Sequence, residues 1–486
     1  MMIERAERRG RARLGVTIAF AIALFAAAGC AVGPRYRVPE TPTPAVFKEA
    51  GDWVPAQPHD QVPRGPWWTA FGDSVLDRLE SQVEVSSQTL AAAEAQYRQA
   101  LALAGIAYSG QFPSVGLDAS GARVQSPAKS GTVEPPPVNT VAAGLTAAWE
   151  LDLWGRLRRT AEAGRASAQA SAADLESARL SLHALLAQTY FSLRTVDHDR
   201  SIIDRLSRGY EQSLQITQNQ YDVGVAARSD IDAATAQLKQ AQAEGIDLEV
   251  QRAQLEHALA VLMGRFPSTF SLTPAESTAT LPTPPAILPT QLLERRPDVA
   301  AAERRLAASS ASIGVAASGY FPNVTLSGSG GYQAPQTTNL FTAPYQVWAL
   351  GAALTQTIFD AGRTRATVAG ARAAYDQDLA DYRETVLEAF QDVEDNLAAI
   401  HILEREQGVQ TEATDAAQQS LERTLNQYRA GTVNHVNVLN AQAALFVAER
   451  AGSDLAGRRY QAAVALYKAT GGDWIVPSGA PPPARQ

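Results

Sequence analysis

The sequence has few of the residues that build disulfide frameworks, metal centres or common active sites. Its 486 residues include one cysteine and six histidines, which are too few for a disulfide scaffold or a zinc cluster. It lacks a Gly-x-Ser-x-Gly nucleophile motif and a His-Glu-x-x-His helix, and His183 and His198 do not have the spacing of metal ligands. We therefore predict that the protein is not an enzyme and has no catalytic residue, metal site or bound cofactor.

Basic charge and long apolar runs are scarce as well. The formal net charge is −8 and the pI is about 5.4, which argues against a nucleic-acid partner. Beyond the first 30 residues, no stretch approaches the roughly 18–20 apolar residues that a membrane-spanning helix needs. If the chain crosses a membrane, it must therefore do so as strands of a closed barrel, because backbone polar groups in lipid need partners.

The N-terminus resembles a bacterial lipoprotein signal. Arginines precede an apolar stretch from Leu14 to Ala28, and Ala27-Ala28-Gly29 supplies small residues at a cleavage point. The resemblance implies a signal peptide over 1–29 and acylation of Cys30, for example with palmitate. Because Ala31 is not Asp, it also implies sorting to the outer membrane. Ala27 stands where such signals usually have Leu, and the alternative is an ordinary signal peptide with a leftover cysteine.

The rest of the chain is an internal duplication. Residues 109–121 (SGQFPSVGLDASG) and 318–330 (SGYFPNVTLSGSG) match at eight of thirteen positions with an offset of 209. Residues 219–225 (NQYDVGV) and 426–432 (NQYRAGT) align at an offset of 207. The pattern predicts an N-terminal anchor segment 30–73, a first repeat 74–272, a proline-rich linker 273–289, a second repeat 290–472 and a C-terminal tail 473–486.

Each repeat is expected to contain a helix, two strands, a long helix, a turn and a further helix. Apolar residues at alternate positions predict strands at about 112–124, 140–153, 321–332 and 345–359. Apolar residues spaced by about 3.6 predict long coiled-coil helices. No Gly or Pro interrupts these helices between Arg165 and Arg208 or between Ala371 and Gln407.

Strand number predicts an oligomer. Four strands cannot close a membrane barrel, because the smallest such barrels have eight. An open sheet would leave its edge amides and carbonyls unpaired in lipid. Two chains would supply eight strands around an interior nearly filled by side chains, whereas three chains would supply twelve strands around a lumen.

Two motifs resemble those of a known family. The segment Trp67-Trp68-Thr69-Ala70-Phe71-Gly72-Asp73, followed by Leu76, resembles the WWxxFGDxxL opening of TolC-like outer membrane efflux factors. The segment 292–299 (LLERRPDV), followed by Ala302-Glu303, resembles their LLxRRPDVxxAE motif. Together with the lipoprotein signal, these motifs are closest to the OprM/NodT-like lipoprotein branch. Pro297 suits the first turn of a helix, and Asp298 complements its positive end.

This resemblance implies a mainly α fold with two structural repeats and a membrane β-barrel. The long coiled-coil helices would form an α-barrel in the periplasm, and the four strands per chain would contribute to a trimeric 12-stranded β-barrel. The implied protein is a homotrimer that is lipid-anchored in the outer membrane. Its implied partners are a periplasmic adaptor (membrane fusion) protein and an inner-membrane pump of the resistance-nodulation-division (RND) class. It would passively conduct small molecules, such as drugs and toxic compounds, to the exterior.

The resemblance also places a gate at two helix hairpins. Gly224 and Gly431 are expected at tight turns, since Gly suits a left-handed helix end, and the family has these hairpins at its periplasmic tip. Asp230 falls where the family's first repeat supplies an acceptor that holds the closed tip, and Tyr428 falls at the position of its partner. The alternative is that Asp230 is only a helix-start residue beside Ser229.

Two asparagines depart from the family pattern at this tip. Asn437 and Asn440 fall where relatives often place aspartates that face the pore axis. A threefold aspartate ring attracts cations, whereas an asparagine ring is uncharged. Val433 likewise replaces a basic residue of some relatives, and His435 is expected to be a solvated turn residue.

Two other functions remain open from the sequence. One is the outer membrane channel of a type I protein secretion system with an ATP-driven pump, although the lipoprotein signal favours efflux. The other is a non-channel trimeric coiled-coil surface protein, which would require uninterrupted heptads and no duplicated strand pairs.

Overall fold

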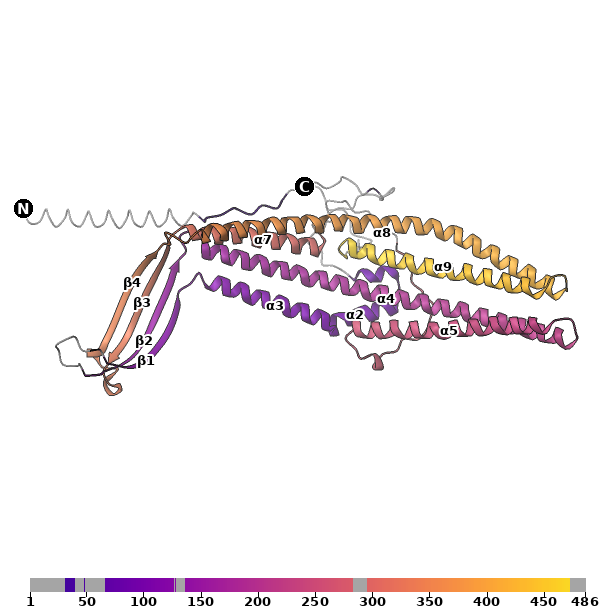
Figure 1. Cartoon of the computed structure of the whole chain (residues 1–486), viewed down its shortest axis with the longest axis horizontal. Coiled ribbons are helices and arrows are strands. Elements are labelled where there is room, and N and C mark those ends of the chain that lie inside the picture. The colour runs from indigo at the N-terminus through magenta and orange to yellow at the C-terminus, as the bar shows by residue number, and fades with distance from the viewer. Residues whose placement is uncertain are drawn as a thin grey trace, which may run out of the picture. The chain divides into compact units, whose positions relative to one another are not determined.

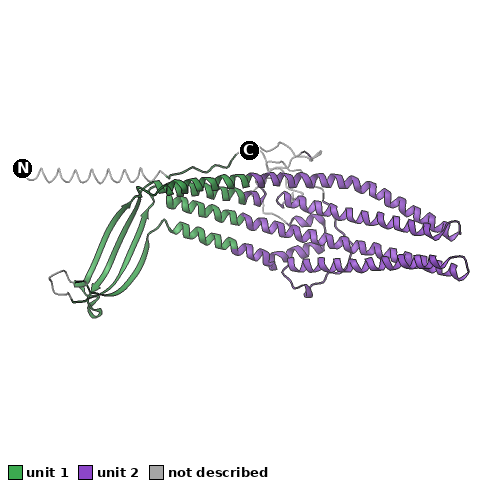
Figure 2. Cartoon of the chain, viewed as in Figure 1, with its two compact units in different colours: residues 1–40, 96–172, 301–382 green, residues 41–95, 173–300, 383–486 purple. Residues whose placement is uncertain are grey.

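The computed structural model describes residues 31–39, 48, 66–125, 127, 136–282 and 295–472. The chain forms two compact units, each of which contains parts of both repeats (Figure 2). Unit 1 comprises residues 1–40, 96–172 and 301–382, and unit 2 comprises residues 41–95, 173–300 and 383–486. The expected signal peptide 1–29, Cys30, most of the anchor segment, the end of the linker and the tail 473–486 lie outside the described residues.

Both repeats fold in the expected order of elements (Figure 1). The first contains a 3-10 helix η1 (Trp67–Phe71), α2 (Ser74–Ser86), α3 (Gln88–Ser109), β1 (Ser114–Val124), β2 (Val138–Leu151), α4 (Arg156–Asp222) and α5 (Arg228–Leu262). The second contains α7 (Pro297–Ala317), β3 (Asn323–Ala334), β4 (Gln346–Thr355), α8 (Arg363–Arg429) and α9 (His435–Ala469). The equal lengths of the matching helices, 67 residues for α4 and α8 and 35 for α5 and α9, reflect the duplication.

The long helices begin at equivalent points in the two repeats. Gly155 and Gly362 precede α4 and α8 with φ angles of 82° and 88°, a backbone conformation that Gly adopts without strain. Asp152 then accepts from the amides of Leu157 and Arg158 at 3.0 and 2.9 Å, and Asp360 accepts from the amide of Thr364 at 2.8 Å. These carboxylates satisfy amides that the first helical turn leaves unpaired.

Within the described residues, no helix has both the length and the apolar character to cross a membrane.

The four strands form one antiparallel sheet in unit 1, in the order β1-β2-β3-β4. The central pairing joins the two repeats, with Val141 opposite Ala334 and Leu151 opposite Val324. β4 ends at Thr355, four residues before the expected end, because its partner β3 begins at Asn323. Pro322, the preceding residue, has no amide hydrogen with which to extend the ladder.

Contacts at one end of the sheet tie the repeats together within unit 1. The indole of Trp154 donates to the carbonyl of Pro322 at 2.8 Å and stacks on Phe321 with ring centroids 4.8 Å apart. The segment 31–39 packs at the same place, since the amide of Val32 donates to the carbonyl of Trp154 at 2.9 Å. Val32, two residues after Cys30, therefore lies close to the start of α4.

Aromatic residues form the core of unit 2. Trp67 and Phe71 are almost completely buried. Trp67 stacks on Tyr467 with ring centroids 5.3 Å apart, and Phe71 lies 5.0 Å from Phe191. The WWTAFGD motif thus packs η1 against α4 and α9. Burying each such ring contributes on the order of 2–3 kcal/mol, which is why this motif requires aromatic residues.

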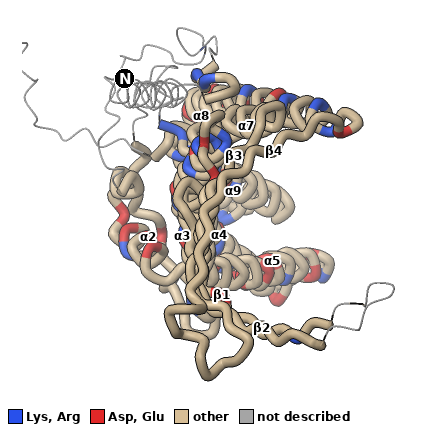
Figure 3. The backbone as a smooth tube through the Cα atoms, turned by 90° about the vertical axis from the view of Figure 1, so that its left-hand side faces the viewer, with Lys and Arg blue, Asp and Glu red and all other residues tan. Residues whose placement is uncertain are grey.

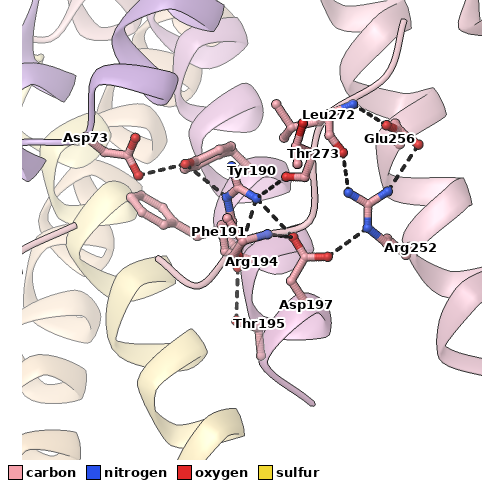
Figure 4. A network of polar contacts seen from close by, with 11 residues as sticks. Asp73, Tyr190, Phe191, Arg194, Thr195, Asp197, Arg252, Glu256, Leu272 and Thr273 are labelled. Atoms are coloured by element: carbon pink, nitrogen blue, oxygen red, sulfur yellow. Dashed lines mark hydrogen bonds and ion pairs between the residues drawn. The ribbon is translucent and has the colours of Figure 1, made fainter. Parts of the chain in front are cut away.

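A buried polar network begins at the last residue of the same motif (Figure 4). Asp73 caps α2 by accepting from the amide of Val75 at 2.8 Å, and it also accepts from the hydroxyl of Tyr190 at 2.7 Å. Arg194 donates to that hydroxyl at 3.1 Å and to Asp197 at 3.0 Å. The network therefore links the entry to α2 with the middle of α4.

The network continues into the segment where the linker was expected to begin (Figure 4). Arg252 donates to Asp197 at 2.7 Å and to the carbonyl of Leu272 at 2.5 Å. Arg194 donates to the carbonyl of Thr273 at 3.1 Å. Two guanidinium groups on different helices thus bind the backbone carbonyls of Leu272 and Thr273. Residues 273–282 belong to unit 2.

The RRPDV motif forms a second ionic centre in unit 2. α7 begins at Pro297, as expected, and Arg296 donates two hydrogen bonds to Asp298 at 3.0 and 2.6 Å. Arg296 also donates to Asp392 at 2.9 Å and to the carbonyl of Ala469 at 3.2 Å. Burial raises the pKa of Asp298, but the Arg296 guanidinium outweighs burial and holds that pKa below its usual value. Arg296 therefore connects the start of α7 with α8 and the end of α9.

His183 is a third buried ionic centre of unit 2. Its Nδ1 lies 2.6 Å from Glu80 and its Nε2 lies 2.9 Å from Glu84, while Trp68 stacks on the ring at 4.5 Å. Burial lowers the pKa of His183, but the two carboxylates outweigh this effect and raise it. Burial raises the pKa of Glu80 to about 7. The sequence alone gave no sign of this pairing.

Candidate functional site

The sheet of unit 1 has two chemically different faces, which its register defines. Leu117 lies opposite Leu145, Trp149 opposite Leu326 and Gly328 opposite Leu350, so these residues share one face. Large apolar side chains cover this face: Val115, Leu117, Val141, Leu145, Trp149, Leu326, Trp348, Leu350 and Leu354. The exposed fractions of Leu117, Trp348 and Leu350 are 78%, 74% and 81%. An apolar surface of this kind indicates contact with lipid or with another protein.

The opposite face carries small and polar side chains. Its members include Gly116, Asp118, Ser120, Thr140, Gly144, Thr146, Thr325, Ser327, Ser329 and Gly351. Most of the sheet is uncharged, in contrast to the helices (Figure 3). An alternation of apolar and polar faces is typical of membrane strands that have lipid on one side and water on the other.

β1 and β4 are the two edges of this sheet. They contain 11 and 10 residues, and every residue of both is exposed in the described chain. Neither strand contains Pro or Lys, the residues that commonly block pairing at an edge. Their free backbone groups can therefore pair with the strands of another chain.

The two helix hairpins lie in unit 2 and turn at the expected glycines. Gly224 and Gly431 have φ angles of 79° and 74°. The amide of Gly224 donates to the carbonyl of Tyr221, and the next amide, that of Val225, donates to Gln220. The second hairpin repeats this pair of bonds from Gly431 and Thr432 to Tyr428 and Gln427. Both turns are Schellman motifs, which satisfy the last carbonyls of α4 and α8.

Asp230 and Tyr428 have different partners within the described chain. Asp230 is half-buried in the first turn of α5 and accepts from the amide of Ala227 at 3.0 Å. Tyr428 is buried, and its hydroxyl donates to Gln220 at 2.8 Å. In this single chain, Asp230 thus acts as the helix-start residue of the alternative reading. The repeated NQY segment, which contains Gln220, was the only signal for the partner of Tyr428.

His435 differs from the sequence expectation of a solvated turn residue. It is 7% exposed and lies against Tyr428 with ring centroids 5.5 Å apart. Its Nε2 is buried without a hydrogen-bond partner among the described residues. Burial lowers the pKa of His435, and the nearby Asp230 carboxylate opposes this shift. The expectation was wrong because the hairpin packs its first α9 residue inward, between the helices.

Asn437 and Asn440 lie three residues apart at the start of α9, so they share one face of the helix. Both side chains are exposed in the described chain. The side chain of Asn434 caps the helix by accepting from the amide of Asn437 at 3.3 Å. The exposed side chains of Asn437 and Asn440 are therefore polar and uncharged.

Known proteins resemble this chain in sequence across both repeats. The family profile described as "Outer membrane efflux protein" matches residues 79–265 and 288–472. The probable efflux pump outer membrane protein TtgC of Pseudomonas putida is 30% identical over 476 residues, which cover 95% of this chain and 96% of that protein. The pyoverdine export outer membrane protein OpmQ of Pseudomonas aeruginosa is 32% identical over 416 residues, which cover 84% of this chain and 87% of that protein.

Solved structures resemble it as well. The outer-membrane channel OprN superposes with a TM-score of 0.85 at 31% identity, covering 92% of this chain and 100% of that chain. The open state of the MtrE outer membrane channel of Neisseria gonorrhoeae superposes with a TM-score of 0.81 at 28% identity, covering 91% of this chain and 98% of that chain.

Proposed function

The chain belongs to the outer membrane efflux protein family, and from this membership we propose that it is the outer-membrane channel subunit of a tripartite efflux pump. It conducts small molecules, such as drugs and toxic compounds, passively to the exterior. Members of the family are transport components rather than enzymes. In this proposal, an inner-membrane partner supplies the energy for transport. The small-molecule substrate class is supported by the efflux and export functions in the relatives' names.

The sheet is the observation that carries this proposal. It has an apolar face, a polar face and two exposed edges, and it contains four strands. Four strands cannot enclose a lumen, whereas three copies supply a closed barrel of twelve strands. β1 of one copy then pairs with β4 of the next, the apolar face meets lipid, and the polar face lines the lumen.

The helices supply the periplasmic part of the conduit in this proposal. α4, α5, α8 and α9 form an α-barrel with their counterparts in the other two copies. The hairpin turns at Gly224 and Gly431 form its periplasmic tip. Asp230, Tyr428, Asn437 and Asn440 line the gate there. The Schellman turns and the exposed Asn437 and Asn440 support this assignment, because each hairpin ends in a compact turn and the second also exposes uncharged polar side chains there.

The partners follow from the same proposal. A periplasmic adaptor (membrane fusion) protein connects the tip to an inner-membrane pump of the RND class. A lipid on Cys30 anchors each chain in the outer membrane. The contact between Val32 and Trp154 supports this anchor, because it holds the residues after Cys30 beside the sheet that we place in the membrane.

Disulfide trapping between the sheet edges tests the trimer. Ser120 on β1 and one of Val347, Ala349 and Gly351 on β4 are changed to Cys in pairs, because all four lie on the polar face. Within one chain the two edges are separated by two strands, about 14 Å, which is too far for a disulfide. Oxidised double variants in membranes should therefore form dimers and trimers on denaturing gels.

Each single-cysteine variant is the matched control, and it should form no species larger than a dimer. Products that stop at the monomer for every pair would contradict the trimeric barrel.

Susceptibility measurements separate efflux from the other two functions. Deletion of the chain should increase susceptibility to several unrelated small toxic compounds and leave the levels of secreted proteins unchanged. Loss of one secreted protein with unchanged susceptibility would instead indicate type I secretion. Loss of neither would favour a surface protein.

A further inference from the structure

We propose that Asp118 is the charge-selecting residue of the strand-built part of the channel, where three copies form a ring of carboxylates that favours cations over anions. This inference rests on the proposed trimer and adds a substrate preference to it.

Of the charged residues in the four strands, Asp118 is the one whose charge on the polar face is not neutralised by an ion pair within the described chain. The four strands contain three charged residues, which are Asp118, Arg123 and Glu150. Arg123 lies on the other face, in register with Asn139 near the end of β1. Glu150 is neutralised by Arg156, which donates to its two carboxylate oxygens at 2.8 and 2.5 Å. Among the described residues, Asp118 is therefore the strand carboxylate on this face without an ion-pair partner.

The surroundings of Asp118 leave its carboxylate uncovered. Gly144 lies directly opposite it on β2, and Gly331 lies next in the same row on β3. The hydroxyl of Thr146 donates to Asp118 Oδ2 at 2.7 Å, which fixes one carboxylate oxygen. Asp118 is exposed, and its neighbours along the row have no side chains to cover it. In a barrel, this carboxylate would extend from a floor of glycines into the lumen.

Asp230, the charged member of the gate, is half-buried and accepts from the amide of Ala227 at 3.0 Å. Asn437 and Asn440, the exposed members of the gate, are both amides. A ring of carboxylates in a water-filled passage raises the local concentration of cations and lowers that of anions. The range of this effect is about 10 Å at 0.1 M salt and about 30 Å at 0.01 M, so selectivity should increase as salt is diluted.

Reversal potentials of the full-length protein in planar lipid bilayers test the proposal. Wild type is measured in a roughly tenfold KCl gradient that ends near 0.01 M, where screening is weak. We expect K⁺ to permeate several-fold better than Cl⁻. Asp118→Asn should abolish most of this preference while still conducting, and Asp118→Ser serves as a second neutral variant in case the first does not assemble.

Two further variants complete the design. Ser120→Asn, on the same face, is the matched control and should keep the wild-type reversal potential. Ser329→Asp, placed in the Asp118→Asn background, restores a carboxylate to this face and should restore the preference for K⁺. Channels in which both neutral Asp118 variants keep the wild-type reversal potential would overturn the selectivity role alone. A wild-type protein that never conducts would overturn the proposed channel, and this inference with it.

Discussion

At the scale of single residues, buried charged side chains hold together segments of unit 2 that are far apart in the sequence. Arg296 binds Asp392 and the carbonyl of Ala469. His183 binds Glu80 from a different helix. Such groups have lost much of their hydration and are stable only while their partners remain. Removing one of them should therefore cost more than removing a surface ion pair.

Arg296→Ala should lower the free energy of unfolding by about 2–3 kcal/mol, less than the roughly 3–5 kcal/mol for a fully buried pair, because Asp392 is half-exposed. Arg296→Lys should have an intermediate effect, since Lys keeps the charge but loses the paired donors of the guanidinium. Arg304→Ala is the control, because the Arg304 side chain is 48% exposed, and it should change stability by less than about 0.5 kcal/mol. Denaturant unfolding followed by circular dichroism measures all three. Equal losses for Arg296→Ala and Arg304→Ala would contradict the structural role of the motif.

The Glu80–His183 pair should make stability fall as pH rises. Burial raises the pKa of Glu80 from 4.5 to about 7, and the carboxylates raise the pKa of His183 above 6.5, so the folded state holds protons that the unfolded state has already released. From about pH 4.5 to 7 and above, this pair should therefore reduce the free energy of unfolding, by at most about 1.4 kcal/mol per pH unit for each proton.

The double variant Glu80→Gln with His183→Gln should remove this contribution to the pH dependence. His257→Gln is the matched control, because His257 is exposed on α5, and it should keep the wild-type slope. Unfolding midpoints measured at several pH values give the three slopes. The same slope in wild type and the double variant would show that the pair does not titrate in this window.

At the scale of elements, fewer residue types fit at the ends of the long helices than in their middles. α4 and α8 each continue for 67 residues and end two residues before a glycine with a positive φ. Gly431 has a φ of 74° and Gly408 lies inside α8, and a Cβ at either position would meet no atom within 4 Å. Substitution at these two glycines therefore separates backbone strain from crowding.

Gly431→Ala should destabilise the α8–α9 turn by about 1–2 kcal/mol, because an L-residue is strained in the left-handed conformation. Gly408→Ala should instead stabilise the helix by about 0.5–1 kcal/mol, since Ala loses less backbone entropy. Hydrogen exchange of peptides that span each position measures these changes. Exchange at the turn should become roughly 5- to 30-fold faster in Gly431→Ala. Unchanged exchange there would mean that the turn does not depend on glycine.

At the scale of the whole molecule, the two faces of the sheet decide where the protein is stable. Leu350 and Ala349 are neighbours on β4, and the register places them on the apolar and the polar face. Both are exposed in the single chain, so a water-soluble protein would tolerate a charge at either position about equally. A membrane barrel would not.

Leu350→Lys should prevent assembly in the outer membrane, because a lysine in the middle of the lipid-facing surface costs about 2–4 kcal/mol in each chain. Ala349→Lys should assemble, since its charge meets water. The amount of trimer in the outer-membrane fraction measures the difference. Normal assembly of Leu350→Lys would contradict the assignment of the apolar face to lipid.

Much of the fold could be predicted because it depends on local patterns. Alternating apolar residues identified four strands, and the repeated NQY-x-x-G segment identified both hairpin turns, since period and glycine each act on a few neighbouring residues. The end of β4 and the burial of His435 were predicted incorrectly. The first depends on where the partner strand begins, and the second on packing between helices.

By itself, the sequence determined the duplication, the family and the alternation of each strand. Only the tertiary structure decided that β2 pairs with β3, joining the two repeats into one sheet, and that Arg156 neutralises Glu150 while Asp118 stays exposed on the polar face. Periodicity along a strand cannot reveal these relations. They connect residues on separate elements, and their geometry exists only after the chain has folded.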